Sequence, residues 1–312
     1  MTSEADKENS TLLSPDEAFA VLGNETRIQI LRVLGRADAP LAFSELYDRI
    51  EYDTTANFNY HLDKLEGHFV RRTDEGYALR QTGRRVVQAI LSGAVTDDPV
   101  VEATEVDFPC RHCGAPVEVS YSRGEMRLSC TECSGNVDIS AVRDVDEDVE
   151  YGNLANSSLP PAGVQGRTAA DVFRTAATRS HLDALAASSD VCPRCSAPLD
   201  HSTSVCDEHD ATDGLCDQCD RHYAVLVHFR CTNCIYEQGF SAVMALLNVP
   251  ELLTFVGEHG LNVTADGIEW GWDFDEEILS TDPFEARFTF TIDGDSIALT
   301  VDDELNVGEV SR

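Results

Sequence analysis

Ten of the eleven cysteines in this chain form five C-x-x-C pairs, and this spacing constrains the fold more than any other feature of the sequence. The pairs are Cys110/Cys113, Cys130/Cys133, Cys192/Cys195, Cys216/Cys219 and Cys231/Cys234. A C-x-x-C turn directs two thiolates at one tetrahedral Zn²⁺ ion, and two such turns complete a structural site. A redox role is disfavoured because the pairs lack a thioredoxin-like βαβ context. The spacing therefore predicts structural zinc sites, which supply folding energy to small domains.

The first two pairs predict a zinc ribbon over residues 108–143. Sixteen residues separate Cys113 from Cys130, and they contain strand-like runs at 116–121 and 126–129 around a turn at 122–124. Such a hairpin carries one cysteine pair on each arm, so that four thiolates face one metal ion.

The seven cysteines in residues 191–238 allow two arrangements. In the first, strand-like segments at 197–205 and 223–230 pair antiparallel and carry one metal site at each end. One end holds Cys192, Cys195, Cys231 and Cys234, and the other holds Cys206, His209, Cys216 and Cys219. In the second, one ribbon uses Cys216/Cys219 with Cys231/Cys234, which leaves three cysteines unassigned and His209 as a surface histidine. We favour the first arrangement because eleven cysteines and one histidine then form three sites of four ligands. This arrangement predicts three zinc ions per chain. The second arrangement predicts two, so we expect at least two.

These sites do not resemble catalytic zinc centres. A catalytic zinc keeps one coordination position open and usually mixes histidine and carboxylate ligands, whereas the predicted sites are closed and rich in thiolate. The sequence also offers no nucleophile–base pair and no phosphate-binding loop. We therefore do not expect an enzyme.

The chain is strongly acidic. Its 56 Asp and Glu against 23 Lys and Arg give a net charge of −33, and only two of the cations are lysines. An acid excess spread along the chain with almost no lysine resembles proteins of extreme halophiles. It excludes a protein that coats nucleic acid by bulk positive charge. The polar N-terminus does not resemble a signal peptide and no run approaches the roughly 18 apolar residues of a membrane span, so we expect a cytoplasmic protein with no membrane partner.

The N-terminal segment has the pattern of consecutive helices, a tight hairpin and a closing helix. The predicted elements are a helix that begins at Ser14-Pro15, helices over Asn24–Gly35, Phe43–Ile50 and Thr54–Glu66, a hairpin over Val70–Arg80 and a helix over Thr82–Leu91. In the fourth helix Phe58, Leu62 and Leu65 form the buried stripe. The residues expected to point away from that stripe are Ala56, Asn57, Asn59, Tyr60, Asp63 and Lys64.

These segments resemble the arsenic-repressor (ArsR-like) family of winged helix-turn-helix transcriptional regulators. The resemblance rests on NETRIQILRVL, FSELYDRI, TTANFNYHLDKLEG and VRRTDEGYALRQTG, and it covers about residues 14–93. Together with the cysteine pairs and the acid excess, the whole chain resembles multi-part regulators of halophilic archaea. The resemblance implies that the helix Thr54–Glu66 reads DNA in the major groove and that the hairpin contacts the flanking DNA backbone. It also allows the regulator an effector ligand. The family often senses metal through cysteines on the preceding helix, but Phe43–Ile50 contains none, so the resemblance does not extend to a metal-sensing site there.

The residues expected to contact double-stranded DNA lie on the fourth helix and on the hairpin. They are Thr54, Thr55, Asn57, Asn59, Tyr60, Lys64, Arg71 and Arg72. Asparagine is suited to bidentate pairing with adenine, whereas lysine and arginine on phosphates position the protein without specifying sequence. Over residues 54–85 six cations outnumber four acids, although the rest of the chain carries −35. Helix capping and solvation remain the alternative for each Asn and Thr, and a winged helix that binds protein remains the alternative for the whole segment.

The remaining segments complete an α+β, multidomain organisation. The C-terminal part is expected to continue helically over Gly239–Leu247, to form a helix capped by Asn248–Glu251 that ends near Gly260, and to form a hairpin over residues 288–301, with a strand beginning near Trp270 and Trp272. The predicted order is a disordered tail (1–13), a winged helix-turn-helix (14–93), a linker (94–107), a zinc ribbon (108–143), an acidic and Pro/Gly-rich linker (144–168), a helix (169–190), a second zinc-binding hairpin (191–238) and a small α+β domain (239–312).

The favoured function is a sequence-specific, DNA-binding transcriptional regulator that forms a homodimer. Helix-turn-helix dimers read paired half-sites, and the candidate dimer surfaces are Pro15–Leu22 and Thr82–Leu91, the latter with Val86, Val87, Ile90 and Leu91. The alternative is a protein-binding adaptor, since archaeal basal transcription factors also join a winged helix to a zinc ribbon and contact the polymerase assembly.

Overall fold

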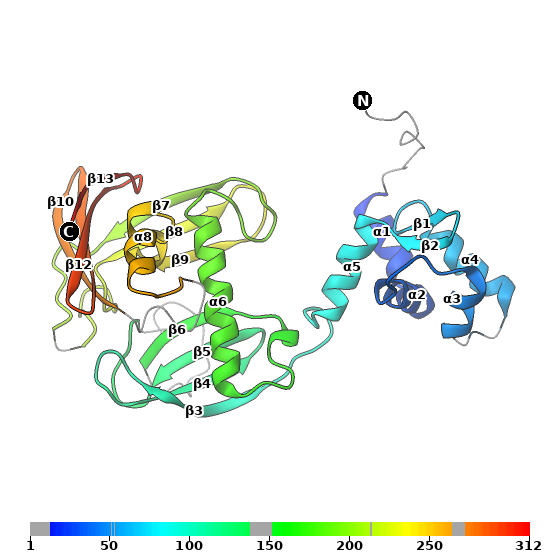
Figure 1. The fold of residues 1–312 in the computed structure, drawn as a ribbon, viewed down its shortest axis with the longest axis horizontal. Coiled ribbons are helices and arrows are strands. Elements are labelled where there is room, and N and C mark those ends of the chain that lie inside the picture. Colours follow the sequence, from blue (N-terminus) through cyan, green and yellow to red (C-terminus); the bar gives the residue numbers. More distant parts are fainter. Residues whose placement is uncertain (1–12, 51, 53, 138–151, 213, 264–271) are drawn as a thin grey trace. The chain divides into compact units, whose positions relative to one another are not determined.

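The computed structural model describes residues 13–50, 52, 54–137, 152–212, 214–263 and 272–312, which form two compact units, Met1–Asp97 and Asp98–Arg312 (Figure 1). Helices and several sheets are both present, as expected for an α+β chain. No helix in the described part of the chain is long and apolar enough to cross a membrane. Residues 1–12 of the predicted tail, the acidic run 144–150 and Trp270 lie outside the described residues.

The elements of the N-terminal unit lie within a residue or two of the predicted bounds. They are α1 (Pro15–Leu22), α2 (Glu25–Gly35), α3 (Phe43–Ile50), α4 (Thr55–Leu65), β1 (Val70–Thr73), β2 (Gly76–Leu79) and α5 (Gln81–Leu91). The Ser14 backbone N–H donates to Glu17 at 2.8 Å in a capping box. Asn24 Oδ1 accepts from the Arg27 N–H at 3.2 Å. These caps satisfy backbone donors that no helix can satisfy internally, so they fix where α1 and α2 begin.

One core holds the N-terminal unit together. The predicted stripe of α4 is fully buried, and it packs with α2 and α3 around Ile30, Leu31, Leu46, Phe58, Leu62 and Leu65. His61 is buried beside this stripe, which the sequence analysis did not anticipate. Val87 of α5 also belongs to this core, so it is not available to the predicted dimer surface.

The described residues of the C-terminal unit form three antiparallel sheets in sequence order. The first holds β3 (Val101–Pro109), β4 (Pro116–Ser122), β5 (Glu125–Cys130) and β6 (Gly152–Ser158); the second holds β7 (Leu199–Val205), β8 (Val225–Cys231) and β9 (Glu237–Ser241); the third holds β10 (Asp273–Thr281), β11 (Phe284–Ile292), β12 (Asp295–Asp302) and β13 (Val307–Ser311). Its helical elements are η3 (Pro161–Gly163), α6 (Ala169–Ala187), α7 (Ala242–Ala245) and α8 (Pro250–Glu258).

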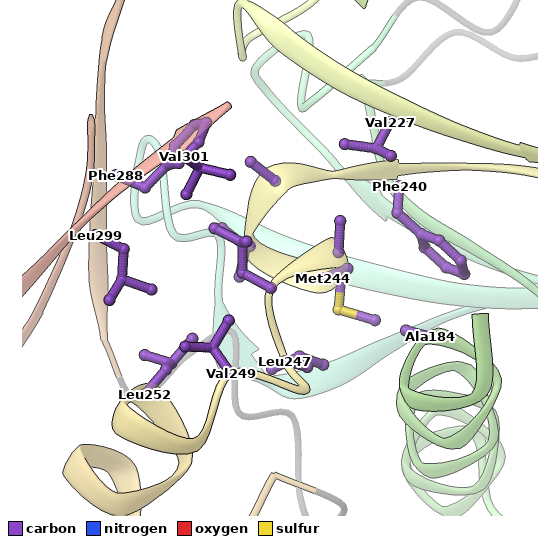
Figure 2. Packing of buried hydrophobic residues seen from close by; sticks show 14 of the residues in the cluster. Ala184, Val227, Phe240, Met244, Leu247, Val249, Leu252, Phe288, Leu299 and Val301 are labelled. Atoms are coloured by element: carbon purple, nitrogen blue, oxygen red, sulfur yellow. The ribbon is translucent and has the colours of Figure 1, made fainter. Parts of the chain in front are cut away.

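A single large core joins the second and third sheets. Figure 2 shows the chain from Met244 to Leu252 between Ala184 of α6 on one side and Phe288, Leu299 and Val301 of β11 and β12 on the other. The same cluster contains Val227 of β8 and Phe240 of β9. One hydrophobic core therefore extends across both the predicted zinc hairpin at 191–238 and the predicted α+β domain at 239–312.

Both predicted linkers contain strands. The linker at 94–107 includes most of β3, and the described part of the linker at 144–168 includes β6 and η3. β3 and β6 are the edge strands of their sheet. An edge strand needs backbone pairing on one side only and tolerates charged or small polar side chains, so VEATEVDFP and GNLANSS lack the apolar alternation of an inner strand. The helix expected over Gly239–Leu247 begins instead as β9, and α7 has only four residues.

Candidate metal centres

The structure brings all twelve predicted metal ligands together as three groups of four. The groups are Cys110, Cys113, Cys130 and Cys133; Cys192, Cys195, Cys231 and Cys234; and Cys206, His209, Cys216 and Cys219. We call them the first, second and third clusters. Within each cluster the ligand atoms all lie within 4.8 Å of one another. The double-ended hairpin is therefore confirmed as a grouping of side chains, and the single-ribbon alternative is wrong.

Hairpin ends position each cluster. Cys110 and Cys113 precede β4 and Cys130 ends β5, so the first cluster closes the end of the β4–β5 hairpin. The second and third clusters close opposite ends of the β7–β8 hairpin, whose register pairs Leu199 with Cys231 and Val205 with Val225. A strand pair frays first at its ends, and metal ligation would hold both ends of β7–β8 closed.

The C-x-x-C turns have the local geometry that a metal site needs. The backbone N–H two residues after the first cysteine of a pair donates to the sulfur of that cysteine. His112 donates to Cys110 and Arg194 donates to Cys192, both at 3.4 Å. The residue after the second cysteine is left-handed in three of the turns, at Gly114, Ser196 and Asp220. That conformation turns the chain away so that both sulfurs face the same point.

The sulfur separations fit tetrahedral coordination. With a Zn–S distance of about 2.3 Å, neighbouring sulfurs of a tetrahedral site lie about 3.8 Å apart. The Sγ–Sγ distances are 3.6 Å for Cys110–Cys133, 3.5 Å for Cys113–Cys130, 3.7 Å for Cys192–Cys234, 3.5 Å for Cys195–Cys231 and 4.0 Å for Cys206–Cys216. The residues present therefore fit a tetrahedral, thiolate-binding metal ion.

His209 has the environment of a ligand. Its Nδ1 lies 3.5 Å from Cys219 Sγ, close to the roughly 3.6 Å expected between nitrogen and sulfur on one tetrahedral zinc. Its Nε2 lies 3.1 Å from the backbone oxygen of His222. A proton on Nε2, assigned from that contact, donates to the carbonyl and leaves the Nδ1 lone pair directed at the cluster. The surface-histidine alternative does not account for this orientation.

Several of these thiols have shifted pKa values. The backbone N–H of Ala197 and the side-chain amide of Asn233 donate to Cys195 and lower the pKa of its thiol to about 6. Backbone hydrogen bonds likewise lower the pKa of Cys216 to about 6, whereas burial raises the pKa of Cys206 to about 11. Metals bind the thiolate, so a lowered thiol pKa favours metal binding at neutral pH.

A polar network that the sequence analysis missed joins the first and third clusters. His112 Nε2 lies 2.7 Å from Asn136 Oδ1, and the backbone N–H of His222 donates to the Asn136 backbone oxygen at 2.8 Å. The His112 and His222 rings lie 4.0 Å apart. Burial lowers the pKa of both rings, which keeps them neutral side by side. The only sequence signal was a histidine within or just after a C-x-x-C pair.

The residues predicted to contact DNA are exposed in the N-terminal unit. All eight lie on α4, at its N-cap or on β1: Thr54, Thr55, Asn57, Asn59, Tyr60, Lys64, Arg71 and Arg72. Thr54 is the N-cap, yet its side chain makes no capping hydrogen bond. Bridge pairing of Glu66 with Val70 brings the end of α4 against the start of β1. The exposed polar side chains of α4 and the two exposed arginines of β1 therefore lie on adjoining elements.

Internal contacts hold some of these side chains. Asn57 Nδ2 donates to the Tyr52 hydroxyl at 3.2 Å, and Asn59 Nδ2 donates to Asp63 at 3.0 Å. Lys64 Nζ lies 5.6 Å from the centre of the Tyr60 ring, a cation–π distance. Each asparagine keeps a carbonyl oxygen and a second N–H free of these bonds, which is the pair that adenine recognition uses.

Comparison with known families covers both units. Residues 15–90 match the family described as Domain of unknown function (DUF7347). Residues 107–307, which contain all three clusters, match the family described as Domain of unknown function (DUF7351). No curated protein and no solved structure matches the chain. Since the second match spans more than half of its length, the chain belongs to the DUF7351 family.

Proposed function

We propose that this chain is a sequence-specific, DNA-binding transcriptional regulator with an ArsR-like winged helix-turn-helix at its N-terminus and three structural zinc sites in its C-terminal unit. One observation carries the proposal: α4 buries Phe58, Leu62 and Leu65 and exposes Asn57, Asn59 and Tyr60. A helix that is anchored on one side and polar on the other can enter a major groove without losing its core contacts.

The charge distribution supports this assignment. Arg71 and Arg72 are exposed on β1, and within the described residues neither forms an ion pair with a carboxylate. In a chain of net charge −33, cations without acidic partners beside an exposed helix form a local site for phosphates. Base contacts from α4 would supply sequence preference, and these arginines would fix the register on the duplex.

Zinc is the metal that best matches the clusters. Two clusters offer four thiolates and the third offers three thiolates with one imidazole, the donor sets of structural zinc sites. When bound, zinc supplies folding free energy and cross-links the hairpin ends. Eleven cysteines without a disulfide also favour a reducing compartment, so we propose a cytoplasmic location.

We also propose that the regulator is a homodimer. The N-terminal unit exposes Phe19 of α1 (74%) and Leu91 of α5 (43%), which are large apolar side chains that a partner would cover. Light scattering at molar KCl across the micromolar range should give twice the chain mass, and Phe19→Ser should yield the monomer. A wild-type monomer over that range would exclude the dimer.

Selection of bound fragments from a random duplex library at molar KCl tests the DNA-binding function. We expect an enriched motif, a loss of preference for it in Asn59→Ala worth about 1–3 kcal/mol on the cognate site, and an equal weakening on cognate and scrambled DNA in Arg71→Ala. Gln29→Ala removes an exposed amide from α2, outside both the DNA-contact set and the candidate dimer surfaces, and serves as the matched control. No enrichment, together with co-purification of the polymerase, would replace the regulator with the protein-binding adaptor.

A further inference from the structure

The C-terminal unit contains a cavity of about 220 Å³ next to the metal clusters. Its walls come from β6, α6, β8 and β9, together with residues that flank the clusters. The lining combines apolar side chains, among them Phe173 and Met244, with polar ones, among them Asn153 and Tyr236. Concave, mostly apolar sites with a few convergent polar groups are typical of small-molecule binding sites.

Each of the three clusters contributes one arginine to this cavity. Arg111 lies between the two cysteines of the first pair, Arg194 lies within Cys192–Cys195, and Arg221 follows Cys219 by two residues. The turn geometry that directs sulfurs at the metal also fixes the backbone from which each arginine extends. Three cations from distant parts of the sequence therefore line one cavity, in a chain that has few cations.

The cavity carries an excess of positive charge. Arg194 is paired with Asp183 at 2.8 Å, and Asp183 is the only carboxylate among the described lining residues. Arg111 donates to the backbone oxygen of Trp272 at 3.5 Å and Arg221 to the Ser204 hydroxyl at 3.3 Å, both neutral acceptors. Two half-buried guanidinium groups whose hydrogen-bond acceptors are neutral favour an anion beside them, because hydrogen bonds between two charged groups are the strong ones.

One acid outside the lining interacts with these arginines, but within the described residues it forms no ion pair with them. Glu276 interacts electrostatically with Arg221. However, its Oε2 accepts from the backbone N–H groups of Ala224 and Val225 at 2.8 and 3.1 Å. The guanidinium groups therefore keep donors available for a ligand.

Two buried polar atoms on the cavity wall lack a partner. The hydroxyl of Tyr236 and Oδ1 of Asn153 make no hydrogen bond within the described part of the chain, and both residues are more than nine-tenths buried. An unsatisfied buried polar group costs about 1–3 kcal/mol, so native proteins seldom leave one unless a ligand or ordered water completes it.

We propose that this cavity binds a small organic anion, with a carboxylate or phosphate group between Arg111 and Arg221 and a short apolar body against Phe173 and Met244. The inference does not require DNA binding, and it stands or fails separately from the proposed function. If the chain is a regulator, the cavity is its effector site, and the metal clusters hold the arginines that recognise the effector.

Binding of small probes to the full-length, zinc-loaded protein tests the proposal. The probes are benzoate, phenyl phosphate and the neutral benzamide, measured by saturation-transfer NMR and by calorimetry at about 0.5 M and about 2 M KCl. We expect at least one anion to bind, about tenfold or more tighter than benzamide, and more weakly at the higher salt. Comparing the two anions shows whether the site prefers carboxylate or phosphate.

Variants locate the site. Arg111→Gln and Arg221→Gln should each weaken anion binding about tenfold, and Arg221→Lys should retain part of it. Arg230→Gln is the matched control, because Arg230 also adjoins a cluster cysteine but does not line the cavity. Zinc content is measured for every variant, so that a loss of fold is separated from a loss of binding. Absence of binding by both anions, or equal binding by wild type, Arg111→Gln and Arg221→Gln, would overturn the proposal.

Discussion

Replacing Glu276 with glutamine should stabilise the C-terminal unit at neutral pH, and the gain should shrink as the pH falls. Glu276 lies on β10, and its Oε2 accepts two backbone hydrogen bonds from the start of β8. Its Oε1 is buried and, within the described residues, has no partner. Burial is the main cause that raises the pKa of this carboxyl from 4.5 to about 7, and the two hydrogen bonds only partly offset it. Glutamine keeps an acceptor for both N–H groups and cannot ionise.

The size of the effect follows from the raised pKa. At about 1.4 kcal/mol for each pKa unit, ionised Glu276 costs the folded state about 3 kcal/mol. Because the folded pKa is the higher one, the stabilisation from Glu276 is fully present below pH 4.5 and is lost as the pH rises through 7. Linkage over pH 5.5 to 7.5 gives a loss of about 2 kcal/mol in wild type that the glutamine variant should not show.

Urea unfolding of the zinc-loaded protein measures this difference. Both tryptophans, Trp270 and Trp272, belong to the C-terminal unit, so their fluorescence follows that unit alone. Glu277→Gln is the matched control, because Glu277 is exposed and pairs with Arg287 at 2.7 Å on the surface, where an ion pair contributes about 1 kcal/mol or less. Zinc loss at the lower pH would affect all variants equally. A gain for Glu276→Gln that is equal at pH 5.5 and 7.5 would refute the reasoning.

Three further predictions concern the metal and the DNA. Elemental analysis should give three zinc ions per chain in wild type and two in His209→Ala. Two zinc ions per chain in wild type would show that the third cluster does not bind zinc. Removal of zinc by a chelator should unfold the C-terminal unit and leave the helical circular-dichroism signal of the N-terminal unit intact, because residues 1–97 contain no cysteine. Unfolding of both units together would contradict this. The logarithm of DNA affinity should fall with the logarithm of KCl concentration much less steeply than about −0.9 per phosphate contact. The reason is that salt also screens the repulsion between DNA and the rest of this acidic chain. The full slope in a KCl titration would contradict this prediction.

Much of the secondary structure and all of the cluster pairing could be predicted from the sequence, because both depend on short, regular spacings. The caps at Ser14 and Asn24 and the spacing of Phe58, Leu62 and Leu65 define helices within the N-terminal unit. The similar intervals between cysteines, ten residues between Cys195 and Cys206 and eleven between Cys219 and Cys231, favour the antiparallel pairing that β7 and β8 form. In each case one local rule decides the outcome.

The parts that could not be predicted depend on contacts between distant segments. β3 and β6 gain their pairing only as edges of a sheet that β4 and β5 nucleate, so their own composition resembles a loop. The packing of α7 and α8 between α6 and β11–β12 makes one core of segments that sequence analysis divides. The Asn136 link between two clusters has no periodicity that would reveal it.

The three arginines show how metal sites can position the side chains of an anion-binding site in an acidic chain. A surface with net charge −33 repels anions, so an anion site must hold cations in a fixed arrangement and partly away from the surrounding acids. Arginine has a long side chain whose ordering costs conformational entropy, and a rigid backbone turn lowers that cost by fixing where the side chain begins. A C-x-x-C turn closed on a metal is such a turn. Arg111 and Arg194 occupy the positions between the cysteines of their pairs, and Arg221 follows the third cluster directly. Loss of metal should therefore remove anion binding before it removes the secondary structure of the sheets.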